Sequence, residues 1–262
     1  AQKVWKRIIV VLAGPVTNLV FAVLLSFVTL TAFGDYIPAI YEVNQNSPAE
    51  AAGMLPGDII TDINGKTVKF FSQTVDMIQS AKTEDISIDI LRDGAEQTLI
   101  LKNVYNEEQG KNVIGVTLTT ERMQFSVGES ALRSVDYIRE ILHGTFQFFG
   151  KAAQGEVSSE DVGGPLAILA MISEAVRTGG ENVMRLLVLI SASLGIMNLL
   201  PIPAMDGGRL VFMVIEAVRG KQIPQEKEAM VHFIGLILLF GLLIFLSIND
   251  AGNIINGVYS GS

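Results

Sequence analysis

The stretch NLLPIPAMDGGRL, residues 198–210, ends a long apolar run with two prolines and one carboxylate, Asp206, beside two glycines. A charged side chain at the centre of a membrane helix costs roughly 2.5–3.5 kcal/mol on insertion scales, and less near a helix end. In one interpretation Pro201 and Pro203 break the helix and Asp206 caps the next one at Gly207, because Asp is a good N-cap. In the other, Asp206 has a chemical role. The residue types alone leave both interpretations open.

The two histidines are the strongest remaining metal-binding side chains, because the chain contains no cysteine. His143 lies in ILHGTF and His232 in MVHFIG, and neither has a glutamate beside it or a second histidine four residues on. They therefore do not form an H-E-x-x-H motif, in which two histidines on one helix face bind zinc and the glutamate is a general base. We interpret both as structural or interfacial histidines.

Three apolar segments are long enough to cross a hydrocarbon core, which takes about 20 helical residues. They cover residues 8–33, 186–205 and 229–248, and contain no Asp, Glu, Lys or Arg. The first exceeds a signal-peptide core of about 7–15 residues and lacks a clear A-x-A-like site, so we predict a retained membrane helix. A fourth run, residues 210–218, is interrupted by Glu216 and is too short to span. The segments predict a multi-pass α-helical membrane protein.

The charges are unevenly distributed along the chain. Residues 35–121 hold 14 acidic and 6 basic residues, so the whole formal charge of −8 lies there. This predicts a soluble acidic domain, for which nucleic acid is not an expected partner. Basic residues stand before the first span and again between the last two: Lys3, Lys6, Arg7, Arg209, Arg219, Lys221 and Lys227. By the positive-inside rule these ends are cytoplasmic and the acidic domain is outside.

The acidic domain shows a strand and turn pattern, with Asn-Gly at residues 64–65 and Asp-Gly at 93–94 between alternating segments. With SPAEAAGMLPGDIITDING at residues 47–65, it resembles a bacterial PDZ domain over residues 36–119. Such domains bind a peptide as an added strand. The resemblance implies that Ile114, Gly115 and Val116 lie in the receiving strand, within a predicted strand at residues 113–118 and beside a helix at 72–81. A closed groove without a ligand is the alternative.

The segment after the acidic domain is amphipathic. It places apolar side chains near one helix face, namely Leu132, Val135, Ile138, Ile141 and Leu142. A helix of this kind lies on the membrane surface or packs on the PDZ domain, and both interpretations stay open.

Three motifs resemble one family. The string LISASLGIMNLLPIPAMDGGRLVFMVIE at residues 189–216 is similar to the third-ligand segment of site-2 proteases, which are intramembrane zinc metalloproteases. The first helix carries their G-P-x-x-N element at Gly14, Pro15 and Asn18. The string GGPLAI matches a further element of the family, at Gly163, Gly164 and Pro165. The nearest type is the bacterial regulator-of-sigma protease with one PDZ domain. The expected fold is thus a multi-pass α-helical membrane protein with an inserted α+β PDZ domain.

The resemblance also implies a site. Asp206 would be the third ligand of one zinc ion, and Asn198 would hold the substrate strand or the oxyanion. Pro201 and Pro203 would open the backbone for substrate. The other ligands and the general base would come from an H-E-x-x-H helix upstream of residue 1, so these 262 residues alone are expected to be inactive.

The implied function is cleavage of membrane-anchored substrates after a first cut, such as an anti-sigma factor or a signal-peptide remnant. Expected partners are the lipid bilayer, a transmembrane protein or peptide substrate, and a C-terminal peptide at the PDZ domain. The expected location is the bacterial cytoplasmic membrane, with the PDZ domain outside. The alternative is an inactive membrane scaffold that presents a PDZ domain.

The expected order of domains follows from these assignments. Residues 1–34 form a membrane helix with the G-P-x-x-N element, and residues 35–121 form the PDZ domain. Residues 122–182 form a membrane-associated linker, and residues 183–262 form membrane helices with the Asp206 segment.

Overall fold

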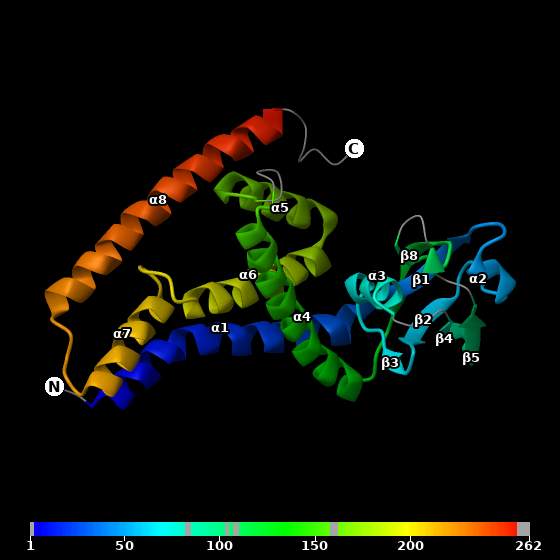
Figure 1. Cartoon of the computed structure of the whole chain (residues 1–262), viewed down its shortest axis with the longest axis horizontal. Helices are drawn as coiled ribbons and strands as arrows, with labels where there is room; N and C mark the ends of the chain where they lie inside the picture. The colour runs from blue at the N-terminus through cyan, green and yellow to red at the C-terminus, as the bar shows by residue number, and fades with distance from the viewer. Residues whose placement is uncertain (1–2, 82–84, 103–104, 107–109, 158–161, 256–262) are drawn as a thin grey trace. The chain divides into compact units, whose positions relative to one another are not determined.

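The structure, a computed structural model, describes residues 3–81, 85–102, 105–106, 110–157 and 162–255 (Figure 1). The chain divides into two compact units. We call Ala1–Phe33 with Ser126–Ser262 the helical unit, and Gly34–Phe125 the β unit.

The helical unit contains α1 (Val4–Phe33), α4 (Val127–Gln154), α5 (Pro165–Thr178), α6 (Gly180–Leu199), α7 (Asp206–Arg219) and α8 (Gln225–Ile255). Among the described residues, α1, α6 and α8 are long and apolar enough to cross a membrane. The second span was predicted at residues 186–205, but α6 both begins and ends six residues earlier. It begins early because Glu181 and Arg185 pair along the helix, at 3.0 Å, instead of ending it. It ends early because the segment with Pro201 and Pro203 cannot continue the helical hydrogen bonds.

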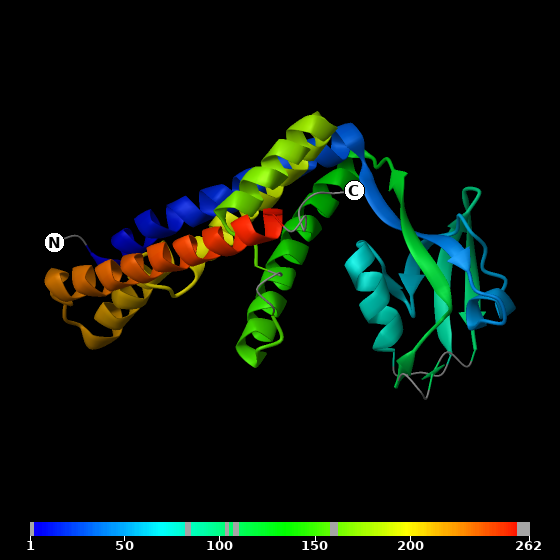
Figure 2. The same cartoon turned by 90° about the horizontal axis from the view of Figure 1, so that it is seen from above.

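Helices α1 and α6 lie side by side (Figures 1 and 2). They pack through small residues. The Ser191 hydroxyl donates a hydrogen bond of 2.9 Å to the Asn18 carbonyl. A Cβ atom on Gly195 would lie only 2.8 Å from Cγ of Leu19, so glycine is needed for this close approach. Ala22 and Ala192 are fully buried in the same interface. This packing is typical of membrane helices, which associate through small residues and hydrogen bonds.

Helix α4 packs on α1 and α6, with Ser130, Ser134 and Ile138 buried. The predicted apolar face is therefore only partly correct. Ile138 lies in the core, but Leu132 and Val135 are 73% and 57% exposed. The reason is geometric: six residues at 3.6 per turn place Leu132 about 120° around the helix from Ile138.

The β unit is an antiparallel sheet with two short helices. Its elements are β1 (Asp35–Val43), α2 (Pro48–Ala51), β2 (Ile59–Ile63), β3 (Lys66–Thr67), α3 (Phe71–Gln79), β4 (Ile86–Arg92), β5 (Ala95–Leu101), β6 (Tyr105–Asn106), β7 (Lys111–Asn112) and β8 (Val116–Met123). The strand order is β5-β4-β2-β1-β8, with β3 paired to β2 and β6 paired to β7 separately. Strand β8 therefore lies at an edge of the sheet.

The local signals of the β unit are confirmed. Ser47 caps α2 by accepting a hydrogen bond from the Glu50 amide. Asn64 and Gly65 have φ angles of 52° and 74°, as a type I′ turn requires. The core is built from buried branched residues, including Ile40, Ile60, Ile63, Ile86, Ile88, Ile90 and Leu101.

The predicted last strand, at residues 113–118, is wrong at its start. Gly115 has φ +78°, which removes residues 113–115 from the sheet. The Ile114 carbonyl instead accepts from the Ala49 amide at 3.0 Å, and the Gly115 carbonyl accepts from Asn44 at 2.9 Å. The strand runs on to Met123 because β1 pairs with it as far as Asp35.

Candidate functional site

Asp206 is the first residue of α7, and Met205 occupies the N-cap position without a side-chain cap hydrogen bond. The interpretation of Asp206 as a helix cap is therefore wrong. The carboxylate is half-buried, and Oδ2 lies 3.6 Å from the position that a Cβ on Gly14 would take. At this distance the carboxylate is in van der Waals range of the Gly14 position. The fold thus brings Asp206 against the G-P-x-x-N element of α1.

The loop between α6 and α7 folds back on itself to present Asp206. The Ile202 amide donates to the Leu200 carbonyl at 2.7 Å, and the Met205 amide donates to the Ile202 carbonyl at 3.2 Å. A Cβ on Gly208 would lie 2.5 Å from the Ile202 carbonyl oxygen, so the glycine lets α7 start directly beneath the loop. The turn is completed by Ala204 with φ +77°.

The other predicted residues of this segment surround the loop. Asn198 is half-buried in the last turn of α6, Pro201 is exposed and Pro203 is half-buried. On α1, Pro15 is buried, and its carbonyl oxygen lies 3.1 Å from the Cβ position of Gly195 on α6. The predicted residues of α1, α6 and α7 therefore meet in one region of the helical unit.

The histidines differ in their surroundings. His143 is exposed on α4. His232 on α8 accepts a hydrogen bond at Nδ1 from the Ala204 amide, at 2.9 Å. Its Nε2 atom is buried and has no hydrogen-bond partner among the described residues. The sequence did not indicate that His232 contacts the loop of Asp206.

The described residues do not make a zinc site by themselves. Within them, no group of three or more His, Cys, Asp or Glu side chains is placed to hold a metal ion. A catalytic zinc takes three protein ligands, and Asp206 supplies one carboxylate. Its oxygens are not engaged in a hydrogen bond within the described residues, so Asp206 is suited to be a single ligand.

The Gly163, Gly164 and Pro165 element belongs to a different region. Asp250, near the end of α8 and fully buried, accepts hydrogen bonds of 3.0 Å each from the amides of Gly164, Leu166 and Ala167. At 1.5 Å per residue, Asp250 lies about 27 Å along α8 from His232. This element therefore starts α5 and is separate from the Asp206 loop.

Sequence reasoning missed Asp250. The sequence did contain a signal for it: Asp250 follows the last apolar run, just as Asp206 follows the apolar run before it. Beside it lies an apolar groove of about 400 Å³, lined by Gly163, Gly164, Pro165, Ile168, Leu169, Leu243 and Leu246.

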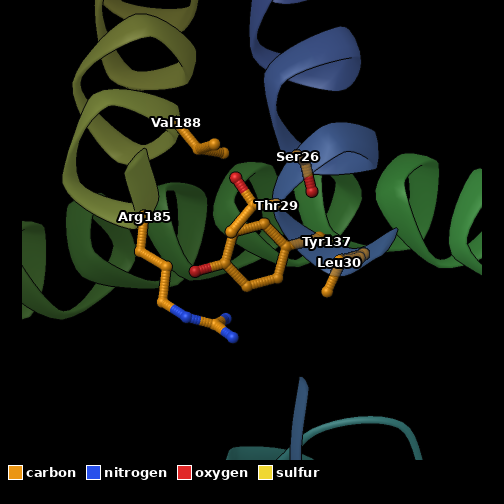
Figure 3. A pocket seen from close by; sticks show the side chains of 6 residues that line it. All are labelled: Ser26, Thr29, Leu30, Tyr137, Arg185 and Val188. Carbon is orange, nitrogen blue, oxygen red and sulfur yellow. The ribbon is translucent and has the colours of Figure 1, made fainter. Parts of the chain in front are cut away.

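A smaller cavity lies where α1, α4 and α6 meet (Figure 3). It has a volume of about 10 Å³ and is lined by Ser26, Thr29, Leu30, Tyr137, Arg185 and Val188. A single water needs at least about this much space, so this cavity is a packing gap and not a substrate site.

The β unit carries a groove of about 250 Å³ between α3 and the start of β8. Val75, Ile78 and Gln79 line it from α3, and Ile114, Gly115 and Val116 line it from the opposite side. Among the described residues, the amides of Ile114 and Gly115 donate no hydrogen bond. Val116 begins the edge strand β8, and Ile114 and Gly115 line the same groove just before that strand, so the expectation that all three lie in the strand is wrong for Ile114 and Gly115.

Comparisons with known proteins agree with the motifs. The model of peptidase family M50 matches residues 1–242. The regulator of sigma-W protease RasP of Bacillus subtilis is 31% identical over 95% of this chain and 60% of that protein. The zinc metalloprotease RasP of Shouchella clausii is 34% identical over 94% of this chain and 59% of that protein.

The chain thus spans about 60% of the length of these RasP relatives. The solved PDZ domain of an SdrC-like protein from Listeria innocua matches 35% of this chain and 100% of that domain, with 23% identity and a TM-score of 0.29. The family model covers all three motifs, and the predicted resemblance is confirmed: the chain belongs to peptidase family M50, the site-2 proteases.

Proposed function

We propose that the protein containing this chain is an intramembrane zinc metalloendopeptidase that cleaves membrane-anchored substrates. The observation that carries this proposal is the placement of Asp206. Its half-buried carboxylate stands at the start of α7, and Oδ2 lies 3.6 Å from the Cβ position of Gly14 on α1. A carboxylate so placed in a membrane protein needs a compensating partner, and a zinc ion is such a partner.

Asp206 is one ligand in this proposal, and an H-E-x-x-H helix elsewhere in the complete protein supplies the others and the general base. Zinc bound there would act as a Lewis acid and lower the pKa of its bound water to about 7. Pro201 and Pro203 interrupt the helix, so carbonyl groups at the end of α6 lack intrahelical donors. The backbone near Asn198 can then pair with an extended substrate strand, and the Asn198 amide can hold the strand or the oxyanion.

The proposed substrates are proteins or peptides already shortened by a first cleavage, such as an anti-sigma factor or a signal-peptide remnant. The name of the Bacillus subtilis relative, a regulator of sigma-W protease, favours the first of these. The groove between α3 and β8 is proposed to receive a C-terminal peptide, because the open amides of Ile114 and Gly115 line it directly before the edge strand β8, and an open sheet edge supports strand addition.

The β unit is proposed to lie outside the cytoplasm of a bacterial cell. One end of the helical unit is basic and closed by an ion pair, in which Arg7 contacts the buried Glu216 at 2.7 Å. Glu216 also accepts from the Ile223 amide at 3.0 Å. A single cysteine at Lys66, in a chain without cysteine, tests the topology. An impermeant thiol reagent should label it in cells whose inner membrane is intact; labelling only after that membrane is opened would reverse the assignment.

The decisive test compares Asp206→Asn with Asp93→Asn in the complete protein. Asp93 lies in an exposed turn of the β unit, so this variant is a matched control. Loss of Asp206 should reduce cleavage of a transmembrane model substrate by at least about 100-fold, the upper range seen for partners outside the ligand shell, and should lower zinc content. The control should keep both. Parent-level cleavage by Asp206→Asn would refute the assignment, and a complete parent protein that does not cleave would favour the scaffold alternative.

A further inference from the structure

The loop that presents Asp206 contains a strained residue. Ala204 adopts φ +77°, a left-handed conformation that costs about 1–2 kcal/mol for a residue with a side chain. Such conformations persist where the surrounding structure holds them. Helix α8 contacts Ala204 directly: His232 Nδ1 accepts a hydrogen bond from the Ala204 amide, at 2.9 Å.

A second contact from α8 reaches the preceding residue. Gly235 stands three residues after His232, on the same face of the helix. A Cβ on Gly235 would lie only 2.7 Å from the Pro203 carbonyl carbon, so the backbone of α8 touches the loop here. On α7, the ring of Phe212 lies 5.8 Å from the His232 ring, centroid to centroid. Pro203 and Ala204 are thus fixed on α8, and His232 is itself packed against α7.

We propose that His232 is a positioning residue for the site. Its Nδ1 atom holds the Ala204 amide by a hydrogen bond, and this fixes the orientation of the Asp206 side chain, two residues further along the chain. The neutral imidazole with the proton on Nε2 has the required acceptor at Nδ1. The role of the loop in zinc binding rests on the proposed function. The hydrogen bond and the shape of the loop do not.

The absence of native cysteine allows a direct test of the loop. A cysteine replacing the half-buried Met205 reports loop opening through its rate of alkylation by iodoacetamide in membranes containing the chain. His232→Leu removes the acceptor and should raise this rate roughly 5- to 10-fold, as expected for one lost hydrogen bond. His232→Asn places Oδ1 near the position of Nδ1 and should restore a rate near the parent's.

His232→Gln places its acceptor one bond further out and should resemble His232→Leu. If the leucine variant does not fold, the Asn and Gln pair alone decides the question, because the two differ only in reach. Phe233→Leu, at a residue 62% exposed beside His232, is the control and should leave the rate unchanged. Equal rates for Asn and Gln, or a parent rate for Leu, would overturn the proposal.

The same variants in the complete protein connect the loop to the site. His232→Leu should lower zinc affinity about 10- to 100-fold, as is usual for a residue that orients a ligand, and His232→Asn should recover it. Altered alkylation with unchanged zinc affinity would overturn the positioning role. If Asp206→Asn keeps full cleavage while the alkylation pattern holds, the proposed function fails and the hydrogen-bonded loop contact stands.

Discussion

The two units of this chain are packed on opposite principles. In the β unit the buried side chains are large and branched, as with Ile60, Ile88 and Ile90. In the helical unit many of the buried positions are small or polar: Ala22, Ser26, Thr29, Ser130, Ser134, Ser191, Ala192 and Gly195. The large apolar side chains of α1 and α8 point outward instead, including Phe21, Leu24, Leu238 and Phe245, each more than half exposed.

The surrounding solvent explains the difference. Water drives large apolar side chains into the core of the β unit, by roughly 1.5–3 kcal/mol for each one buried. Lipid gives no such drive, because its chains are as apolar as leucine, so close backbone contact and hydrogen bonds hold the helices together. Large apolar side chains therefore lie inside the β unit and on the outside of the helical unit.

Buried acidic groups differ between the units as well. In the β unit Asp58 is paired with the Arg92 side chain, with Nε at 2.6 Å from Oδ1, and this contact raises the pKa of Arg92 above its usual value. In the helical unit Asp250 is held by three backbone amides at the start of α5. Without water, a helix N-terminus provides the compensating donors and partial positive charge.

The largest expected effect tests the core of the β unit. Ile88→Ala should lower the free energy of unfolding of this unit by about 2–5 kcal/mol, because it removes a fully buried branched side chain. Ile100→Ala, at a residue 59% exposed, should change it by less than about 0.5 kcal/mol. Urea unfolding of the chain in detergent, followed by hydrogen exchange of the β4 amides, measures both. Equal effects would mean that the core of this unit is not where we place it.

The matching change in the helical unit adds volume instead of removing it. Gly195→Leu should destabilise the contact of α1 with α6 by about 1–3 kcal/mol, because a larger side chain overpacks the interface at Leu19. Leu194→Ala, beside it and 52% exposed, should have little effect. Thermal unfolding of the detergent-solubilised chain compares the two. A larger effect from Leu194→Ala would show that the large side chains, and not the small ones, hold these helices.

Asp250→Asn tests how a buried carboxylate is held. Asp250 Oδ1 accepts from Gly164 and Oδ2 accepts from Leu166 and Ala167, but asparagine keeps only one acceptor oxygen and turns an NH2 donor toward the other amides. The bonds on one side are therefore lost, and those that remain lose the charge of the acceptor, worth about 1 kcal/mol. Hydrogen exchange of these amides should become roughly 5- to 10-fold faster. Glu174→Gln on the exposed side of the same helix makes the same chemical change and should not alter exchange. Unchanged protection in Asp250→Asn would mean that the Asp250 carboxylate does not hold these amides.

The smallest effect concerns Glu129, at the exposed start of α4. Hydrogen bonds from the Ser126 hydroxyl and then from its backbone amide hold the pKa of Glu129 below its usual value. A lowered pKa gives stabilisation that is present above the unfolded value, about 4.3, and is lost as the pH falls through the folded value. Carbon-detected NMR titration should show a higher pKa in Ser126→Ala. An unchanged pKa in that variant would exclude the capping box as the cause.

The sequence by itself determined the elements whose signals are local. Apolar length indicated α1, α6 and α8, and the Asn64-Gly65 turn and Ser47 cap were readable because short-range sterics and hydrogen bonds decide them. The family motifs indicated Asp206. These features need no knowledge of what lies across the fold.

Only the tertiary structure decided which groups meet. The direction of the α4 face depended on its contact with α1 and α6, which buries Ser130 and Ser134 instead of Leu132. The start of β8 depended on Ala49 taking the Ile114 carbonyl away from the sheet.

The sites depended on distant contacts in the same way. Asp206 reaches Gly14 and His232 reaches Ala204 through contacts between residues far apart in sequence, and Asp250 finds its donors 83–86 residues away. The sequence alone gives the chemical type of each side chain. The partner that compensates a buried charge or an open amide is chosen by packing, because that partner must be brought within about 3 Å.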